Sequence, residues 1–536
     1  MYQDNFEEDD LIAEVEFVEQ EVYAKRSPTD DGFDTEGASV QSASTTQIPD
    51  GVRNFILHFY RNVMDNNVYE LHNIYDHSFN KVTDKYYTKQ AWPEAEIVSP
   101  LVNDDQVFLT LYRELYYRYI YSRMAPTLEQ RFNSYENYCD LFNYILNSEG
   151  PVNLELPNQW LWDIIDEFIF QFQSFSNYRD HFANKSEQEL SLLSENPQIW
   201  SCYSVLNVLY SFIQKSRIQE QLLVSKNGGD MMEAAGEYGS RPLYKMLGYF
   251  SIVGLLRVHC LLGDYMLALK MMDNIILNKK AMFARVTACH VTTYYYVGFA
   301  YMMMRRYADA VKSFSTILSF MQKTKQYHSR SYQSDQVSSK VDQMYALLAI
   351  CITMSPTRLD EGIHSKLREK YGEKLIKMQK GDEAIPIFEE FFSRSCPKFI
   401  SATNPDCKVV PERKLHQLNL NVFMSDIRNQ IMLPTIRSFM KLYTSMDVDK
   451  LAKFLETDSE ELKMQLLVYK QKSRQFKWTE GNLIEGEYQS TSDLDFCLKK
   501  DIIHIAEVKI GRRYGDWFLR NISRCEDLVA TLENKA

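Results

Sequence analysis

The C-terminal part of the chain decides the fold. Residues 426–507 read DIRNQIMLPTIRSFMKLYTSMDVDKLAKFLETDSEELKMQLLVYKQKSRQFKWTEGNLIEGEYQSTSDLDFCLKKDIIHIAE. Apolar residues recur at helical spacing from Ile427 to Tyr443, and Pro434 should kink or restart this helix. A shorter amphipathic helix follows Asp447, whose side chain can cap it. We therefore expect two helices at the start of this stretch.

A capping signal introduces a third helix, and the apolar period changes after it. Thr457-Asp458-Ser459-Glu460 has the S/T-x-x-E spacing of a capping box, in which a hydroxyl and a carboxylate bond the first free amides. Beyond this helix, apolar and polar residues alternate at two places, as in strands bounded by turns. The alternating apolar residues are Phe476, Trp478, Ile503 and Ile505. Three helices followed by two strands is the order of a winged helix, which we predict over residues 426–510.

The formal net charge of -12 comes from one end of the chain. The first 50 residues hold 14 Asp and Glu against Lys25 and Arg26, whereas residues 51–536 hold 58 charges of each sign. A globular nucleic-acid-binding protein usually presents a basic face that releases counterions. Residues 51–536 have no net charge, so they give no general support for such a basic face.

Residues 1–50 are predicted to form an acidic, disordered tail. Leu11, Val15 and Val18 have helical spacing within it. Two interpretations stay open: a solvated tail, or an acidic amphipathic helix that folds on a partner.

Composition bounds the class of protein. The chain opens without a basic and apolar targeting signal, and it has no run of roughly 18 apolar residues, so we expect a cytoplasmic protein without a membrane span. The nine cysteines are scattered and include no C-x-x-C. Reduced thiols are therefore expected, rather than disulfides or a zinc ribbon.

Helical periodicity dominates the rest of the chain, so we predict a mostly α protein. Residues 51–250 should form an N-terminal helical domain, with apolar stripes such as Trp160, Ile164 and Phe168 in its core. Residues 251–425 should form irregular repeats that resemble tetratricopeptide repeats.

The repeat signal lies in residues 294–314, which read YYYVGFAYMMMRRYADAVKSF. Gly298 stands where two antiparallel helices of a tetratricopeptide repeat must approach closely. Gly372, Ala384 and Phe388 repeat part of this spacing at an irregular interval. We therefore predict an irregular helical solenoid, whose extended surfaces suit protein partners.

A search for chemistry finds no phosphate-binding loop, zinc-protease motif or nucleophile elbow. The adjacent pairs His259-Cys260 and Cys289-His290 point to different faces of their helices, so we expect core packing rather than metal binding. Asp493 and Asp495 are expected to be exposed beside a turn of the wing. We predict no enzyme, no cofactor and no metal site.

One basic cluster lies on the third helix and its exit. It comprises Lys463, Lys470, Lys472, Arg474 and Lys477. Cations near a helix C-terminus complement its dipole and cover its last carbonyls. The alternative is contact with RNA phosphates or with an acidic partner.

A helical solenoid followed by a winged helix and a terminal helix resembles the PCI family, found in the proteasome lid, the signalosome and eukaryotic translation initiation factor three. Within it, the chain is most similar to the L-subunit branch of the initiation factor. Residues 156–168, 435–439, 441–443, 503–506 and 512–516 carry the resemblance.

The resemblance implies a non-catalytic structural subunit, with a PCI module at roughly residues 305–505. Such a subunit supports binding to the small ribosomal subunit and formation of the preinitiation complex. The implied partners are the other subunits of the factor, especially the K subunit and the other PCI subunits, with RNA contact secondary.

Two sets of residues are expected to bind partners. The sheet and wing set, which should support assembly, comprises Phe476, Trp478, Ile503 and Ile505. The second set lies on a C-terminal helix over residues 511–536, should contact helices of other chains, and comprises Trp517, Phe518 and Ile522.

Two other functions stay open. The first is a PCI scaffold subunit of the proteasome lid or signalosome, which would share the architecture and differ in its partners. The second is a winged-helix nucleic-acid-binding regulator, which would need an exposed and basic third helix.

Overall fold

The structure is a computed structural model and describes residues 48–533. Within this range it leaves out residues 89, 181–184, 278–281, 329–333, 380, 402–414, 480, 491, 493 and 508. The predicted acidic tail therefore lies almost wholly outside the described residues, as does Asp493.

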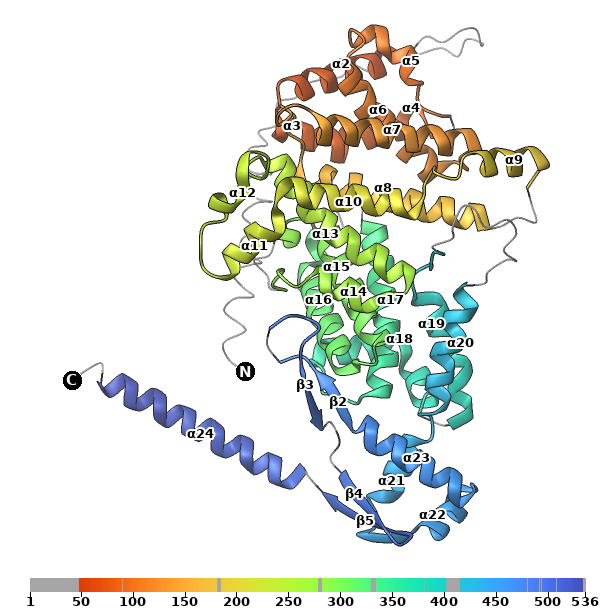
Figure 1. Cartoon of the computed structure of the whole chain (residues 1–536), viewed down its shortest axis with the longest axis vertical. Coiled ribbons are helices and arrows are strands. Elements are labelled where there is room, and N and C mark those ends of the chain that lie inside the picture. The colour runs from red at the N-terminus through yellow and green to blue at the C-terminus, as the bar shows by residue number, and fades with distance from the viewer. Residues whose placement is uncertain are drawn as a thin grey trace. The chain divides into compact units, whose positions relative to one another are not determined.

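The chain forms two compact units (Figure 1). The first comprises residues 1–297, 319–341 and 397–413, and the second comprises residues 298–318, 342–396 and 414–536. Helices dominate both units, which confirms the prediction of a mostly α protein with a solenoid-like arrangement of helices.

The helices that lie wholly in the first unit are α2 (Asp50–Met64), α3 (Val68–Asn73), η1 (Ile74–Ser78), α4 (Phe79–Tyr86), α5 (Ala95–Val98), η2 (Ser99–Leu101), α6 (Gln106–Arg123), α7 (Leu128–Asn147), α8 (Asn158–Asp180), α9 (Glu187–Glu195), α10 (Cys202–Ser216), α11 (Ile218–Lys226), α12 (Met231–Gly239), α13 (Pro242–Leu262), α14 (Tyr265–Met271) and η3 (Met282–Arg285). Three helices are divided between the units: α15 (Thr287–Met303), α16 (Tyr307–His328) and α17 (Ser334–Met354).

The second unit adds α18 (Glu361–Lys377), η4 (Gly381–Ala384), α19 (Ile385–Ser395), α20 (Leu415–Arg428), α21 (Leu433–Met440), β1 (Ser445–Asp447), α22 (Val448–Leu455), α23 (Ser459–Lys472), β2 (Arg474–Lys477), β3 (Glu487–Ser490), β4 (Leu494–Lys499), β5 (Ile502–Glu507) and α24 (Lys509–Glu533). We call residues 433–507 the C-terminal segment.

Aromatic packing forms the core of the first unit, and α8 supplies much of it. Trp160, Ile164 and Phe168 are at most 2% exposed, which confirms that this stripe is core. The Trp160 ring lies 5.2 Å from the ring of Tyr75, and the Phe168 ring lies 5.4 Å from that of Trp200. Aromatic pairs at these separations stabilise a core in addition to the stability that comes from burying their apolar area.

Asp163 of the same helix and Glu114 of α6 lie around the guanidinium of Arg118, whose side chain is 20% exposed. Arg118 contacts Glu114 and the Tyr75 hydroxyl, and its Nη1 lies 3.8 Å from Asp163 Oδ2. The Trp160 indole N–H donates to Glu114 Oε2 over 3.1 Å. Buried charges are tolerated when they are paired and hydrogen-bonded in this way.

Burial changes the proton affinity of two acids in this network. It raises the pKa of Asp163 to about 6, although Arg118 opposes the shift. It also raises the pKa of Glu167, which accepts a hydrogen bond from Gln171, to about 7. Both carboxyl groups therefore hold their protons more tightly in the folded chain than in the unfolded one.

The free energy of unfolding of the first unit should fall as the pH rises from 5 to 8. The folded state binds more protons than the unfolded state in this range, so stability is greatest below it and is lost through the raised pKa values. Because one pKa unit corresponds to about 1.4 kcal/mol, Glu167 should contribute a loss of roughly 2–3 kcal/mol. Urea unfolding at several pH values measures this.

The variant Glu167→Gln tests the cause, because its amide oxygen can still accept from Gln171 without titrating. It should flatten the pH dependence, whereas Glu149→Gln, in an exposed turn, should leave it unchanged. Equal slopes for the wild type and Glu167→Gln would show that this carboxyl is not the source.

One helix of the first unit qualifies as a membrane span by length and apolar composition. Helix α13 passes this test, although Lys245 and Arg257 interrupt its apolar residues. The most apolar window of α13 is 89% buried inside the protein. This burial is what a core helix requires.

The predicted close approach in the repeat is present in the second unit. A Cβ atom added to Gly298 of α15 would lie 2.5 Å from the ring of Phe314 on α16, closer than van der Waals contact allows. Gly372 does not repeat this arrangement, because a Cβ there would meet only Arg368, at 3.5 Å. Ala384 and Phe388, which share its spacing pattern, are buried.

The C-terminal segment starts as the sequence indicated. The helix restarts at α21, with Pro434 in its first turn. Asp447 caps α22 by accepting from the Asp449 amide over 3.2 Å. The capping box was wrong: Asp458 rather than Thr457 is the N-cap of α23, no side-chain cap forms there, and the Thr457 hydroxyl is buried without a hydrogen-bond partner among the described residues.

Two separate antiparallel sheets complete the second unit. One has the strand order β1-β5-β4, with Ile503 of β5 opposite Met446 on one side and Leu498 on the other. The other is the β2-β3 hairpin. The first sheet packs on α21, α22 and α23 through a buried cluster of Ile436, Met440, Met446, Val448, Leu451, Ala452, Leu462, Leu466, Tyr469, Leu494, Phe496 and Ile503.

Candidate functional site

Helix α24 presents an uncovered apolar face. It begins at Lys509, two residues before the predicted start, and ends at Glu533. Trp517, Phe518 and Ile522 are 55%, 57% and 53% exposed. Leu519, Leu528, Val529 and Leu532 are also exposed. Large apolar side chains gathered on one helix and left in water are typical of a surface that binds another protein.

The spacing of these residues explains the shape of the face. Phe518, Ile522, Cys525, Val529 and Leu532 follow one another at alternating steps of three and four residues. This spacing places them along one side of a helix, which is the pattern of helices that pack together lengthwise. Helix α24 thus has the pattern of one member of a helix bundle.

Ile503 and Ile505 lie where the sequence placed them, in a strand of the C-terminal segment. Ile503 is fully buried beneath the three-stranded sheet and Ile505 is half-buried against the same core. Both belong to the central strand β5, so they hold the sheet together rather than forming its rim. The edge strands are β1 and β4, and the outer edge of β4 has no strand partner within the described residues.

Phe476 and Trp478 were expected in the same sheet and wing, and this was wrong. Phe476 belongs to β2 of the separate hairpin, where its ring lies 5.1 Å from that of Tyr488. Trp478 follows β2, and its backbone N–H donates to both carboxylate oxygens of Asp309 over 3.1 and 3.0 Å. These two residues therefore contact the helical repeat of their own unit.

Arg306 is the centre of this contact, and sequence reasoning missed it. Its Nη1 donates to the carbonyl oxygens of Leu483 and Ile484 over 3.1 and 2.8 Å, and its Nη2 donates to that of Glu485 over 3.1 Å. Its Nε donates to Asp309 Oδ2 over 2.8 Å. Four of the five N–H groups of the guanidinium thus fix the loop between β2 and β3 to the start of α16.

Neighbouring groups complete this contact, which we call the Arg306 clamp. The side chains of Arg306 and Asp309 are 4% and 3% exposed, so the ion pair is buried. The Tyr301 hydroxyl donates to the Leu483 carbonyl over 2.9 Å. A Cβ added to Gly486 would lie 2.5 Å from the Lys477 carbonyl oxygen, so this glycine lets the loop lie flat against β2.

Most of the basic cluster is neutralised inside the chain. Lys463 lies 3.0 Å from carboxylates of both Glu460 and Asp501, which raise its pKa. Lys470 pairs with Asp495 and Lys472 lies 3.6 Å from Asp426. These acids come from other turns or elements, so the sequence between residues 462 and 479 did not reveal them.

The remaining two residues of the cluster lie where the chain leaves the third helix, as expected. Arg474 and Lys477 are the first and last residues of β2, which begins two residues after the end of α23. Asp495 is the second residue of β4, and its side chain is 52% exposed as expected. Hydrogen bonding from Lys470 lowers its pKa.

The outward face of α23 is apolar where a DNA-reading helix would be basic. Met464 and Leu467 are 66% and 67% exposed and lie one turn apart. Val468 extends the same face. This face therefore offers contact area to a protein and few donors to a nucleic acid.

A comparison with protein families matches residues 130–525 to the family described as RNA polymerase I-associated factor PAF67. Curated relatives share the sequence at about half of its positions and carry one common name, eukaryotic translation initiation factor 3 subunit L. The chain belongs to the subunit L family.

The match to the subunit L family extends over nearly the whole chain. The relative from Mycosarcoma maydis is 55% identical over 91% of this chain and 75% of its own length. That from Nematostella vectensis is 51% identical over 94% of this chain and 97% of its own length. That from Homo sapiens is 52% identical over 91% of each chain.

The most recognisable stretch of this subunit L family chain, residues 156–168, is used inside the protein. Trp160 and Asp163 belong to the buried network around Arg118, and Phe168 belongs to the aromatic core. This stretch therefore serves folding, whereas the apolar residues Met464, Leu467, Phe518 and Ile522 of α23 and α24 are exposed.

Reactive side chains of this subunit L family chain are used in packing. Burial raises the pKa of the Cys260 thiol, and it lowers the pKa of His259, whose ring nitrogen lies 3.3 Å from the Tyr210 hydroxyl. In the part of the chain that the structure describes, no group of three or more His, Cys, Asp or Glu residues could hold a metal ion.

Proposed function

We propose that the chain is a non-catalytic structural subunit of eukaryotic translation initiation factor 3. The family to which it belongs supports membership of this factor. The structural role is supported by the exposed apolar face of α24, where Trp517, Phe518 and Ile522 are more than half exposed. Burying such a face against other chains gains free energy in proportion to the apolar area removed from water.

We propose that the C-terminal segment is a winged helix and the core of a PCI module at roughly residues 305–505. The order α21, β1, α22, α23, β4, β5 and the sheet order β1-β5-β4 support this assignment, with the β2-β3 hairpin as an insertion. The free edge of β4 is suited to pairing with a strand of a neighbouring subunit.

The proposed partners follow from this assembly. They are the other subunits of the factor, especially the K subunit and the other PCI subunits, together with the small ribosomal subunit in the cytoplasm. The ion pairs of Lys463, Lys470 and Lys472 support a structural role for the basic cluster and leave RNA contact secondary.

Two neighbouring positions on α24 test the proposal. Ile522→Glu places a charge on the apolar face, whereas Ser523→Glu adds the same charge at an exposed polar position next to it. In cells that express a tagged chain, Ile522→Glu should reduce recovery of the other subunits of the factor at least fivefold. Ser523→Glu should recover them as the wild type does.

Both the Ile522→Glu and the Ser523→Glu variant should keep the helical circular dichroism and the melting temperature of the wild type, because residue 522 is not part of the core. Equal recovery of the other subunits with Ile522→Glu and Ser523→Glu would remove α24 as the assembly surface.

A further inference from the structure

Strand β4 lies at one edge of the three-stranded sheet, so part of its backbone points away from β5. The pairing of β5 identifies the groups that do so. Ile505 of β5 donates its N–H to the carbonyl oxygen of Thr444, the residue before β1, over 2.9 Å. Phe496 is the β4 residue opposite Ile505, and in an antiparallel pair it therefore directs its own N–H and C=O toward the outer edge.

Side chains occupy both of these groups of Phe496. Its N–H donates to Asp495 Oδ1 over 2.9 Å, and its carbonyl oxygen accepts from Lys470 Nζ over 2.7 Å. Lys470 and Asp495 also form an ion pair with each other. The carboxylate and the ammonium thus take the places that a carbonyl and an N–H group of a neighbouring strand would have. We call Lys470 and Asp495 the β4 cap.

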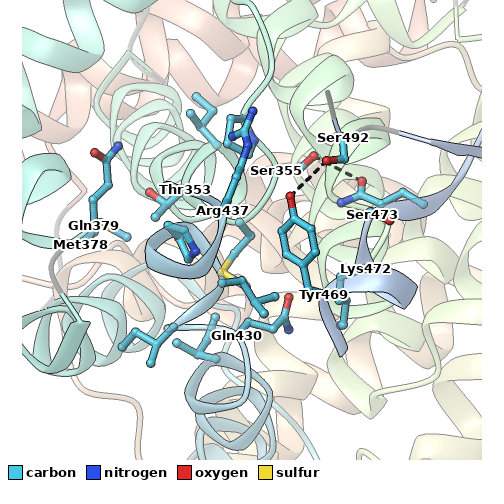
Figure 2. A pocket seen from close by; sticks show the side chains of 18 of the residues that line it. Thr353, Ser355, Met378, Gln379, Gln430, Arg437, Tyr469, Lys472, Ser473 and Ser492 are labelled. Carbon is cyan, nitrogen blue, oxygen red and sulfur yellow. Dashed lines mark hydrogen bonds between the residues drawn. The ribbon is translucent and has the colours of Figure 1, made fainter. Parts of the chain in front are cut away.

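A smaller cap lies two residues earlier in the strand. Leu494 also faces the outer edge, and its N–H donates to Ser492 Oγ over 3.2 Å. Figure 2 shows the Tyr469 side chain directed at this serine, and the two hydroxyl oxygens lie 3.1 Å apart. Tyr469 and Lys470 are consecutive residues near the end of α23. The end of this helix therefore closes the β4 edge at two points.

The β4 cap is suited to being replaced. The side chains of Lys470 and Asp495 are 36% and 52% exposed, and ion pairs in contact with water contribute little to stability. A neighbouring strand would supply backbone groups of the same kind to Phe496. Lysines at exposed sheet edges are a common means by which proteins prevent unwanted strand pairing.

The sequence of β4 fits a second copy of this chain once the edge is open. If two β4 strands pair antiparallel with Cys497 opposite Cys497, Phe496 and Leu498 of the two copies exchange backbone hydrogen bonds. In this register Asp495 lies directly opposite Lys499 of the second copy, and the pair occurs twice. Opposite charges directly across two strands stabilise their pairing.

We propose that Lys470, held by Asp495, closes the β4 edge of the isolated chain against a second copy of this chain and reserves the edge for a strand of a partner subunit. A subunit already bound through other contacts holds its strand near β4 at a high effective concentration, which a second copy in solution lacks. The proposal rests on the assembly function above and describes how one of its surfaces is regulated.

Disulfide trapping at Cys497 tests the proposal on the purified full chain. Cys497 is exposed on β4 and would lie opposite itself at a non-hydrogen-bonded position, where Cα atoms about 4.5 Å apart allow a disulfide. Under a mild thiol oxidant, Lys470→Met should raise the yield of the Cys497–Cys497 disulfide between chains at least fivefold over the wild type. Mass spectrometry of the linked peptides measures the yield.

Three controls assign the effect to the β4 cap. Lys470→Arg keeps the charge and the donors, so it should keep the low yield of the wild type. Lys453→Met removes the same charge from an exposed position of α22 and should not change the yield. Cys525, exposed on α24, reports other encounters between chains, and its disulfide yield should be the same in every variant.

The assembled factor provides the second part of the test. When the Lys470→Met chain is purified together with the other subunits, its Cys497 yield should return to the wild-type level, because a partner strand occupies the edge. A high yield in the assembled factor would overturn the proposal. An isolated Lys470→Met chain with a lower melting temperature and an unchanged yield would also overturn it, since Lys470 would then serve folding alone.

These failures differ from a failure of the assembly function. An unchanged Cys497 yield in a chain that still recovers the other subunits contradicts the role of the β4 cap only. A wild-type chain that recovers no other subunits contradicts the assembly function, and with it the reservation of the edge for a partner.

Discussion

Replacement of Arg306 by methionine is expected to lower the free energy of unfolding of the second unit by about 3–5 kcal/mol, the usual cost of removing one partner of a buried ion pair. The side chain of Asp309 is only 3% exposed, so its charge would be left buried without its cation. The carbonyl oxygens of Leu483, Ile484 and Glu485 would also lose their common donor. Chemical unfolding monitored by circular dichroism measures the change.

A double-mutant cycle separates the ion pair from the rest of the clamp. Asp309→Asn alone should also destabilise, because the carboxylate accepts from the Trp478 amide as well as from Arg306. Arg306→Met together with Asp309→Asn should cost less than the sum of the single changes. Additive costs, or a loss below about 1 kcal/mol for Arg306→Met, would show that the clamp does not hold the loop between β2 and β3.

The double substitution Met464→Glu and Leu467→Glu should reduce recovery of the other factor subunits at least tenfold. Both side chains are about two-thirds exposed on α23, so the change should leave the core of the C-terminal segment intact. Charges placed on an apolar docking face must be desolvated when the partner binds, which is costly. Quantitative mass spectrometry after affinity purification measures the recovery.

The matched control for the α23 variant is Gln417→Glu with Asn421→Glu, which adds the same charge at exposed polar positions of α20. It should leave recovery of the other subunits unchanged. If α23 instead read a nucleic acid, the wild-type chain would bind duplex DNA with a steep dependence on salt, and the two added acids would abolish that binding. We expect no tight DNA binding at physiological salt.

The sequence predicted the local features of the fold well, because they depend on near neighbours. The apolar spacing of Trp160, Ile164 and Phe168 identified a core helix, and Pro434 identified the restart at α21. Gly298 identified a close approach of two helices, since only a residue without a side chain fits beside Phe314.

Features that depend on long-range contacts were missed. Phe476 and Trp478 alternate as strand residues do, but alternation cannot tell which strand pairs with which, and they belong to a separate hairpin. Strand β4 was not predicted, although its apolar residues Leu494, Phe496 and Leu498 alternate as in a strand. The capping box had the right spacing, yet α23 begins one residue later than the box requires, with Asp458 as its N-cap, so the Thr457 hydroxyl caps nothing.

The candidate site was predicted in part for the same reason. The apolar face of α24 follows from spacing within one helix, so Trp517, Phe518 and Ile522 were identified and are exposed. Their role as partner contacts stays a prediction. The Arg306 clamp joins residues about 180 positions apart in the sequence, and no short sequence motif predicts such a contact.

Affinity purification of the full tagged chain from its own cells, followed by mass spectrometry of the bound proteins, tests assembly into the initiation factor most directly. We expect the other subunits of translation initiation factor 3, including the K subunit, in near-equal amounts, together with proteins of the small ribosomal subunit. Recovery of proteasome lid, signalosome or RNA polymerase I subunits without other subunits of the factor would contradict the proposed function.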